Sequence, residues 1–389
     1  MRVYSPDEEI RVRLAGRVRE WAKAGLLSQE QAQRFASDLT TDLRRTGLGL
    51  RLGLALFTAI AGAAATGLVF LLTDLRSEVV VSLVAAAIGV GAFHAATMVV
   101  RDYRLYRHGV EEALAVGAVG LFGLAAGLLS TELFGSNSGS EAWFFAMLGV
   151  AAGAVAVYRR FGFQYAAVVA PCAVALAPMA FRAIGPEGGR LFAALVFGVV
   201  VTRSSLARRH AEHEIALDDW TVIRAAAAGG LYLSLNLHLL SEPFGTSAAG
   251  WFRWGTWGVT WILPFVLGRV AVTERDPLLL RIALAAMLAS LVTNKAYLGW
   301  ARQPWDPMVL GIVLVGAAVL LRRWLATGAD GERGGFTARP LLERDAAFIQ
   351  MVSLASVAVH PVPQRHSEAP ADPSFSGGRS GGAGAGTEF

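Results

Sequence analysis

The chain has 389 residues, of which 54% are hydrophobic and only 17% are charged. Soluble domains carry about a quarter of charged residues, so this composition excludes an ordinary soluble protein and indicates a membrane protein. The net charge is +5, but the basic residues lie between apolar stretches and form no single patch, which argues against nucleic-acid binding. Cys172 is the only cysteine, so an intrachain disulfide is excluded.

Residues 1–47 are polar and predict two short amphipathic helices. The run Ser5–Glu8 matches a capping sequence with proline at the first helical position, and Gly25 marks the expected end of that helix. A second capping sequence begins at Ser28. Apolar residues then recur at helical spacing, namely Ile10, Leu14, Val18 and Trp21 in the first helix and Ala32, Phe35, Leu39 and Leu43 in the second. Because two such helices bury little surface alone, we expect them to pack on each other, on the membrane surface or on another subunit.

Ten apolar stretches follow, each about long enough to cross roughly 30 Å of hydrocarbon. They lie near residues 52–73, 79–100, 112–131, 142–158, 163–183, 189–205, 221–240, 251–272, 277–295 and 307–325. The apolar run of the sixth stretch, Leu191 to Val201, is short, which leaves nine and eleven spans as alternatives. We therefore expect an all-α fold, a polytopic transmembrane bundle of about ten spans at residues 48–327 behind a cytosolic helix pair.

The distribution of basic residues predicts which loops face the cytoplasm. With the N-terminus inside, the inner loops hold Arg101, Arg104, Arg107, Arg159, Arg160, Arg203, Arg208, Arg209, Arg269 and Arg275. The outer loops hold fewer, namely Arg76, Arg182, Arg190, Lys295 and Arg302. This bias predicts that both termini are cytoplasmic. Arginine far outnumbers lysine and the chain is rich in Ala and Gly, which is typical of a GC-rich bacterial genome, so we expect a bacterial inner membrane.

The composition changes again after the last apolar stretch. Residues 328–389 are predicted to be a cytosolic tail that is mostly disordered, because Pro, Ser and Gly dominate from His360 onward. Within the tail, residues 340–358 match one more short amphipathic helix.

Five polar residues inside or near the predicted spans are the candidates for an intramembrane site: His94, Asn236, His238, Asn294 and Lys295. An ionisable group within a membrane is a functional candidate by default, although hydrogen bonds between helices are the more common use of such side chains. Asn236 and His238 are two residues apart, so on a helix they would point about 200° from each other and at most one would face a cavity. We expect Asn236 either to bond another helix or to line that cavity.

Other motifs carry less chemistry. His210 and His213 are three apart on an inner loop, but this spacing does not match the usual two-histidine hydrolase pattern, and a solvated loop is the simpler reading. Glycine pairs at 123/127 and 149/153 predict close packing of two helices. The sequence shows no catalytic, cofactor-binding or metal-binding motif, so neither a cofactor nor an enzymatic reaction is expected.

The run Trp21-x-x-x-Gly25-Leu26-Leu27-Ser28-x-Glu30-Gln31-Ala32 leads directly into many spans. Together with the basic loop Arg104–His108 and the loop before Trp143, it resembles a bacterial family of predicted multi-pass membrane proteins of unknown function, whose members open with a cytosolic helix pair. The resemblance covers roughly residues 14–325. The arginine-poor loop Glu132–Glu141 and the long Gly-rich tail depart from it. The resemblance implies an architecture and no reaction.

These observations leave two main hypotheses. The first is a non-enzymatic membrane scaffold or sensor, whose residues 1–47 bind a protein partner or a second copy. The alternative is a transporter or lipid-handling permease with a polar site between spans, and an intramembrane enzyme is the least favoured class. A polar cavity lined by His94 or Asn236 would favour transport, whereas a filled bundle would favour the scaffold or sensor.

Overall fold

The computed structural model describes residues 2–73, 77–134, 139–210, 214–240, 250–301, 303–328, 332–333 and 336–337. The chain divides into two units, Met1–Pro340 and Leu341–Phe389, and all described residues belong to the first. The amphipathic helix predicted at 340–358 and most of the predicted tail therefore lie outside the described residues.

Two short helices precede the apolar part, α1 (Pro6–Lys23) and α2 (Gln29–Asp38). The capping box predicted at Ser28 is confirmed, because the Gln31 backbone N–H donates to Ser28 Oγ at 3.1 Å and the Ser28 N–H donates to Gln31 Oε1 at 3.0 Å. The box predicted at Ser5 is wrong: Ser5 makes no side-chain cap, and Glu8 pairs with Arg104 instead. Past the end of α1, Gly25 has a φ of 74°, which ends the helix as expected.

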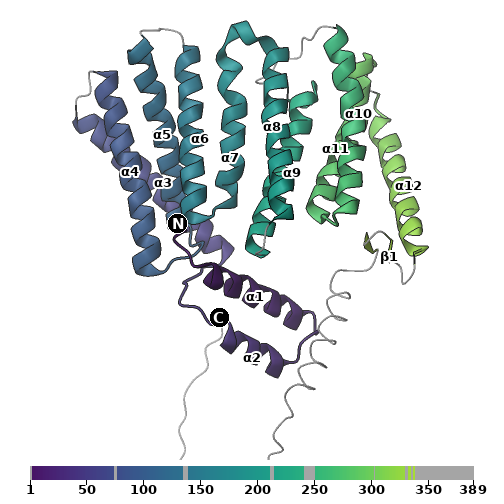
Figure 1. Ribbon diagram of the computed structural model, residues 1–389, viewed down its shortest axis with the longest axis horizontal. Helices are drawn as coiled ribbons and strands as arrows, with labels where there is room; N and C mark the ends of the chain where they lie inside the picture. Colours follow the sequence, from purple (N-terminus) through teal and green to yellow (C-terminus); the bar gives the residue numbers. More distant parts are fainter. Residues whose placement is uncertain are drawn as a thin grey trace, which may run out of the picture. The chain divides into compact units, whose positions relative to one another are not determined.

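A helix forms at each of the ten predicted spans (Figure 1). They are α3 (Leu48–Leu72), α4 (Glu78–Tyr103), α5 (Val110–Phe134), α6 (Gly139–Phe161), α7 (Gln164–Leu176), α8 (Gly185–Arg209), α9 (Glu214–Leu235), α10 (Gly250–Thr273), α11 (Pro277–Leu298) and α12 (Asp306–Ala326). Two 3₁₀ turns, η1 (Ala177–Ala180) and η2 (Arg182–Ile184), follow α7. A minimal antiparallel pair, β1 (Glu332–Arg333) and β2 (Phe336–Thr337), follows α12.

Seven of these helices are long and apolar enough to cross a membrane, namely α3, α4, α5, α6, α8, α10 and α11. The apolar segment that contains α7 is shorter, and α9 and α12 are not among the seven. The N-terminal half of α9 contains Asp218, Asp219 and Arg224, which lowers its hydropathy. The helices thus define a membrane type of fold, while the count of ten spans stays a prediction.

Helices that are neighbours in the chain pack side by side from α4 to α9, and α10 packs against α11 (Figure 1). The predicted glycine contacts between α5 and α6 are confirmed. A Cβ added at Gly149 would lie 2.5 Å from the Phe122 carbonyl oxygen, and one at Gly123 would lie 2.5 Å from Val150 Cγ2. Small residues therefore let these two backbones approach closely. In α4, Ser82 adds a hydrogen bond of 2.8 Å to the Ala125 carbonyl oxygen of α5.

Candidate functional site

The N-terminal segment and the residues that follow α2 are bound to one end of the apolar helices, where α4 and α6 end and α5, α7 and α9 begin. We call this region the N-terminal junction; it comprises residues 2–9, 43–46, 104–112, 158–164 and Asp219. Three backbone hydrogen bonds hold it: Val3 N–H to Arg160 O at 2.8 Å, Arg44 N–H to Arg104 O at 2.9 Å, and Tyr106 N–H to Arg44 O at 3.0 Å. Because backbone bonds fix register, they set the position of the N-terminal segment on the helices.

A buried carboxylate lies at the centre of the junction. Asp219 of α9 is 1% exposed, and it accepts hydrogen bonds from Arg2 at 2.8 Å and from Gln164 at 2.9 Å. Arg13 of α1 lies 3.8 Å from the same carboxylate. Burial lowers the pKa of Arg2, but the hydrogen bond to Asp219 and the negative charges of Asp219 and Glu9 together outweigh burial, so the pKa is raised overall. A buried charge that is paired in this way costs several kcal/mol when one partner is removed, roughly 3–5 kcal/mol.

A second acid of the junction is less well matched to its surroundings. Glu9 of α1 is buried and lies 3.5 Å from Arg2. Burial raises the pKa of Glu9 despite the nearby Arg2 and Arg13. Beside it, the ring of Tyr4 meets the ring of Tyr106 edge-on at 5.0 Å. The junction thus combines a well-paired carboxylate, Asp219, with a second carboxyl group, Glu9, whose pKa is raised by burial.

The loop between α4 and α5 carries backbone conformations that side chains rarely adopt. Arg104 and Arg107 have φ values of 55° and 52°, and Gly109 has a φ of 104°. A Cβ at Gly109 would lie 2.2 Å from the Arg51 carbonyl oxygen, so only glycine fits where α3 approaches the loop. Such conformations cost of order 1–3 kcal/mol each and persist where neighbouring structure imposes them. Here the neighbours that hold the loop are Arg44, which exchanges backbone hydrogen bonds with Arg104 and Tyr106, and α3, which packs on Gly109.

The predicted intramembrane candidate His94 lies on an exposed side of α4. Its ring contacts the ring of Phe93 edge-on at 6.3 Å. In the described part of the chain no hydrogen bond joins His94 to another helix, so neither arrangement considered for it, a cavity or an interhelical bond, is formed by the described residues.

Asn236 is fully buried and forms the hydrogen bond to a neighbouring helix that was one of its two expected arrangements. Its amide nitrogen donates to Thr293 of α11 at 3.1 Å and to Tyr232 at 3.0 Å, and its oxygen accepts from the backbone N–H groups of His238 and Leu239. The expected 200° separation from His238 is wrong, because α9 ends at Leu235 and Asn236 begins a turn. An Asn side chain that caps its own turn competes with the helix and ends it.

The other three candidates face different neighbours. The ring of His238 meets the ring of Tyr297 at 4.6 Å, the Asn294 oxygen accepts from the indoles of Trp257 and Trp261 at 3.0 and 3.3 Å, and Lys295 pairs with Asp306 of α12. Successive residues of α11 point about 100° apart, so Thr293, Asn294 and Lys295 serve three different contacts. The described residues therefore do not bring the five candidates together into one site.

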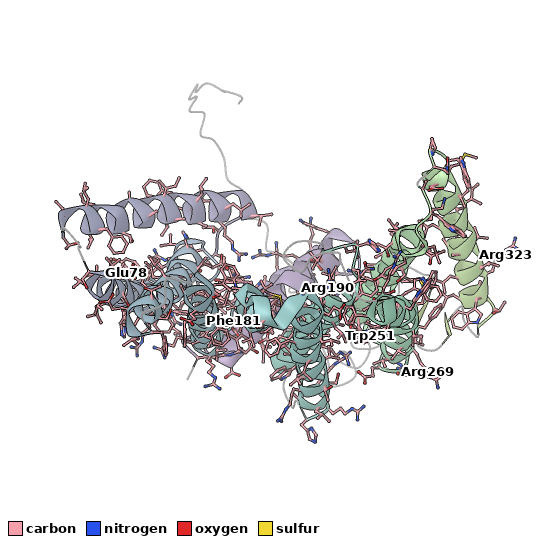
Figure 2. All side chains as sticks on the ribbon, turned by 90° about the horizontal axis from the view of Figure 1, so that it is seen from above. Glu78, Phe181, Arg190, Trp251, Arg269 and Arg323 are labelled. Atoms are coloured by element: carbon pink, nitrogen blue, oxygen red, sulfur yellow. The ribbon has the colours of Figure 1, made fainter. Side chains whose placement is uncertain are left out.

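Arg190 was treated as an outer-loop residue in the sequence, but it is 1% exposed and lies among the helices (Figure 2). Its guanidinium donates to the carbonyl oxygens at the end of α9: Ser234 and Asn236 at 3.1 Å, Leu237 at 3.4 Å and Leu240 at 2.6 Å. Tyr297 completes this end by accepting the Leu237 N–H at 2.8 Å. Sequence reasoning missed this role because no residue type identifies the carbonyl oxygens at a helix end. The available signal was an arginine in the first turn of the predicted span 189–205.

A second buried network lies at the other ends of α8 and α9. Arg224 of α9 and Asp276 are 1% and 0% exposed, and they form an ion pair. Arg208 of α8 adds a bond of 3.0 Å to Asp276, and Glu274 pairs with Arg224. Asp276 also caps α11, because its other oxygen accepts two backbone N–H groups at 3.0 Å. Arg224 is thus buried in a network that joins α8, α9 and the start of α11.

The predicted two-histidine loop gives no metal site within the described residues. His210 donates from Nδ1 to the Leu206 carbonyl oxygen at 2.9 Å, and His213 lies outside the described part. Across the described chain there is no group of three or more His, Cys, Asp or Glu side chains that could hold a metal ion.

Comparisons of the chain with protein-family models, with curated proteins and with solved structures find no match. The resemblance to a multi-pass family therefore remains an interpretation of short motifs, and it contributes no site residue. The fold itself defines a class, a bundle of apolar helices suited to a lipid environment with two polar helices bound at one end.

Proposed function

We propose that the chain is a bacterial inner-membrane protein that crosses the bilayer ten times with both termini in the cytoplasm. The proposal is supported by a helix at each of the ten predicted spans and by the bias of basic residues toward one set of loops. The buried charges of α9 fit this placement, since Asp219 and Arg224 lie in its N-terminal half and both are paired.

The topology predicts the outcome of reporter fusions made after Phe134 and after Ala326. Seven spans separate these two positions in the ten-span arrangement, so the reporters should lie on opposite sides of the membrane. A pair of reporters such as alkaline phosphatase and a fluorescent protein, each active on one side only, measures this directly. The same side for both fusions would mean that the number of spans between them is even.

Within this arrangement we propose a non-enzymatic scaffold or sensor whose N-terminal helices bind a protein partner. The observation that carries the proposal is the attachment of α1 to α9 through Asp219, because it links a polar module outside the apolar helices to a helix inside them. A partner that displaces α1 would shift α9 through this contact, and a movement of α9 would in turn displace α1. No catalytic group enters the proposal.

The placement of the polar side chains favours this hypothesis over transport. A transport site predicts a polar cavity between helices that is lined by His94 or Asn236. In the described structure Asn236 uses both its amide hydrogens and its oxygen within the bundle, and His94 lies on an exposed side of α4. Hydrogen bonding within the bundle accounts for Asn236 without a transported ligand.

The junction predicts opposite effects for its two acids. Asp219→Asn should weaken the attachment of α1 about 10- to 100-fold, because a hydrogen bond to a charged group contributes roughly 1.5–3 kcal/mol. Glu9→Gln should leave the attachment unchanged or strengthen it. The pKa of Glu9 is raised when α1 is bound. At a pH above this raised pKa, Glu9 is charged and its charge weakens the attachment of α1. As the pH falls through the raised pKa, Glu9 takes up a proton and this weakening is lost.

Hydrogen exchange of the backbone amides of α1, measured on the full chain in detergent, tests this prediction. Asp219→Asn should accelerate exchange in residues 6–23 and leave α10 and α11 unchanged. Removing residues 1–45 should leave an inserted bundle while abolishing a partner contact. Failure of the truncated chain to insert, or equal exchange in both acid variants, would contradict a separable module held by Asp219.

A further inference from the structure

A groove of about 400 Å³ lies between α1 and α2, and nothing in the proposed function assigns an occupant to it. We call it the helix-pair groove. Its walls include the apolar side chains Ala15, Val18 and Ala22 of α1, Ala32 and Ala36 of α2, and Leu39, which directly follows α2. Thr40, Thr41 and Leu43 line the same end. The volume falls within the range of natural binding sites, about 300–1,000 Å³.

The spacing of these residues matches a surface built to hold a helix. The α1 residues are three and four apart, as are the α2 residues, so each set forms one stripe along its helix. Alanine predominates in both stripes, and small side chains let a third backbone approach closely. With a rise of about 1.5 Å per residue, α1 and α2 are roughly 27 Å and 15 Å long, and the shorter helix leaves room for about three turns of a third helix.

Two arginines supply the charge of the groove. Arg19 of α1 and Arg45, which follows α2, both line it. Arg45 is held there by a hydrogen bond of 3.3 Å to the Val12 carbonyl oxygen. Burial lowers the pKa of Arg45, and the neighbouring Arg19 lowers it further. Among the described residues neither arginine has an ion-pair partner, whereas Arg2, Arg34 and Arg104 of the same region do.

Two like charges side by side beside an apolar stripe oppose each other until an anion is bound between them. Guanidinium groups bind carboxylates through paired hydrogen bonds, and this contact is stronger where water is excluded. We infer that the helix-pair groove binds an amphipathic helix of a partner protein, with the apolar face of that helix on the alanine stripes and its acidic residues on Arg19 and Arg45. The inference rests on the proposed function, because it specifies the partner of the N-terminal module.

A photo-crosslinking amino acid placed at Ala36, on the groove, tests the inference in cells that express the full chain. A second chain carries the probe at Gln33 of α2, which is exposed and does not line the groove. Each probe is combined with Arg19→Glu plus Arg45→Glu, or with the matched pair Arg11→Glu plus Arg17→Glu, whose arginines are exposed on α1 outside the groove. Mass spectrometry identifies the crosslinked segment.

The expected result is an adduct from position 36 to a helical segment that carries Asp or Glu beside its apolar face. Its yield should fall at least tenfold with the groove pair of substitutions and stay within twofold with the matched pair. Absence of an adduct, or an adduct to lipid, to a second copy or to a segment without acidic residues, would overturn the inference. A protein adduct that persists with Arg19→Glu plus Arg45→Glu would also overturn it, yet would leave the proposed partner-binding module standing.

Discussion

Arg190→Met should lower the stability of the folded chain by about 2–4 kcal/mol, which is a large fraction of the 5–15 kcal/mol of a typical domain. The guanidinium donates hydrogen bonds to carbonyl oxygens at and just beyond the end of α9, among them those of Ser234, Asn236 and Leu240. Methionine can fill part of the space of the arginine stem but has no donors, so these buried carbonyl groups would lose their partner. Each unpaired buried carbonyl costs roughly 1–3 kcal/mol, offset in part because a buried charge is removed.

Thermal unfolding of the purified chain in detergent measures the effect. Arg269→Met is the matched control, because Arg269 is exposed on α10 at the edge of the bundle (Figure 2). It should change stability by no more than about 0.5 kcal/mol. Asn236→Leu, which removes four hydrogen bonds from the same helix end, should resemble Arg190→Met. Equal melting of the Arg190 and Arg269 variants would show that the arginine does not hold the end of α9.

Asp276→Ala should have an effect of similar or larger size, about 3–5 kcal/mol from the buried ion pair and about 1 kcal/mol from the lost cap of α11. It would leave the Arg224 guanidinium, which is 1% exposed, with Glu274 as its acidic partner. Asp276→Asn keeps an oxygen that can cap α11, so it should be milder than Asp276→Ala. The difference between the two substitutions separates the cap from the charge.

A double-mutant cycle tests whether the two charges act as a pair. Asp276→Asn combined with Arg224→Leu should cost less than the sum of the two single changes, because neither charge is then left buried alone. Arg203→Gln, at an exposed position of α8, is the neutral control. Additive effects in the double mutant would contradict the pairing, and so would single substitutions that melt like the control.

The sequence alone determined where the helices form and which parts are apolar. Three predicted features depend on residues that are close together in the chain. They are the helix at each of the ten predicted stretches, the end of α1 just before Gly25, and the capping box at Ser28. The glycine contacts between α5 and α6 were also predictable, because small residues four apart form a face on any helix. These features were predictable because each depends on residue types and spacings within a few turns of one helix.

Tertiary structure decided which polar residues matter. Asp219 binds Arg2 across 217 positions of the chain, and Arg190 meets carbonyl groups 44 to 50 positions away. Neither partner can be found from spacing, because a backbone carbonyl is present at every residue and an ion pair needs only proximity in space. For the same reason Asn294 and Lys295 looked like one site but face different helices. A turn of about 100° per residue separates them, and only the positions of α10 and α12 show what each side chain meets.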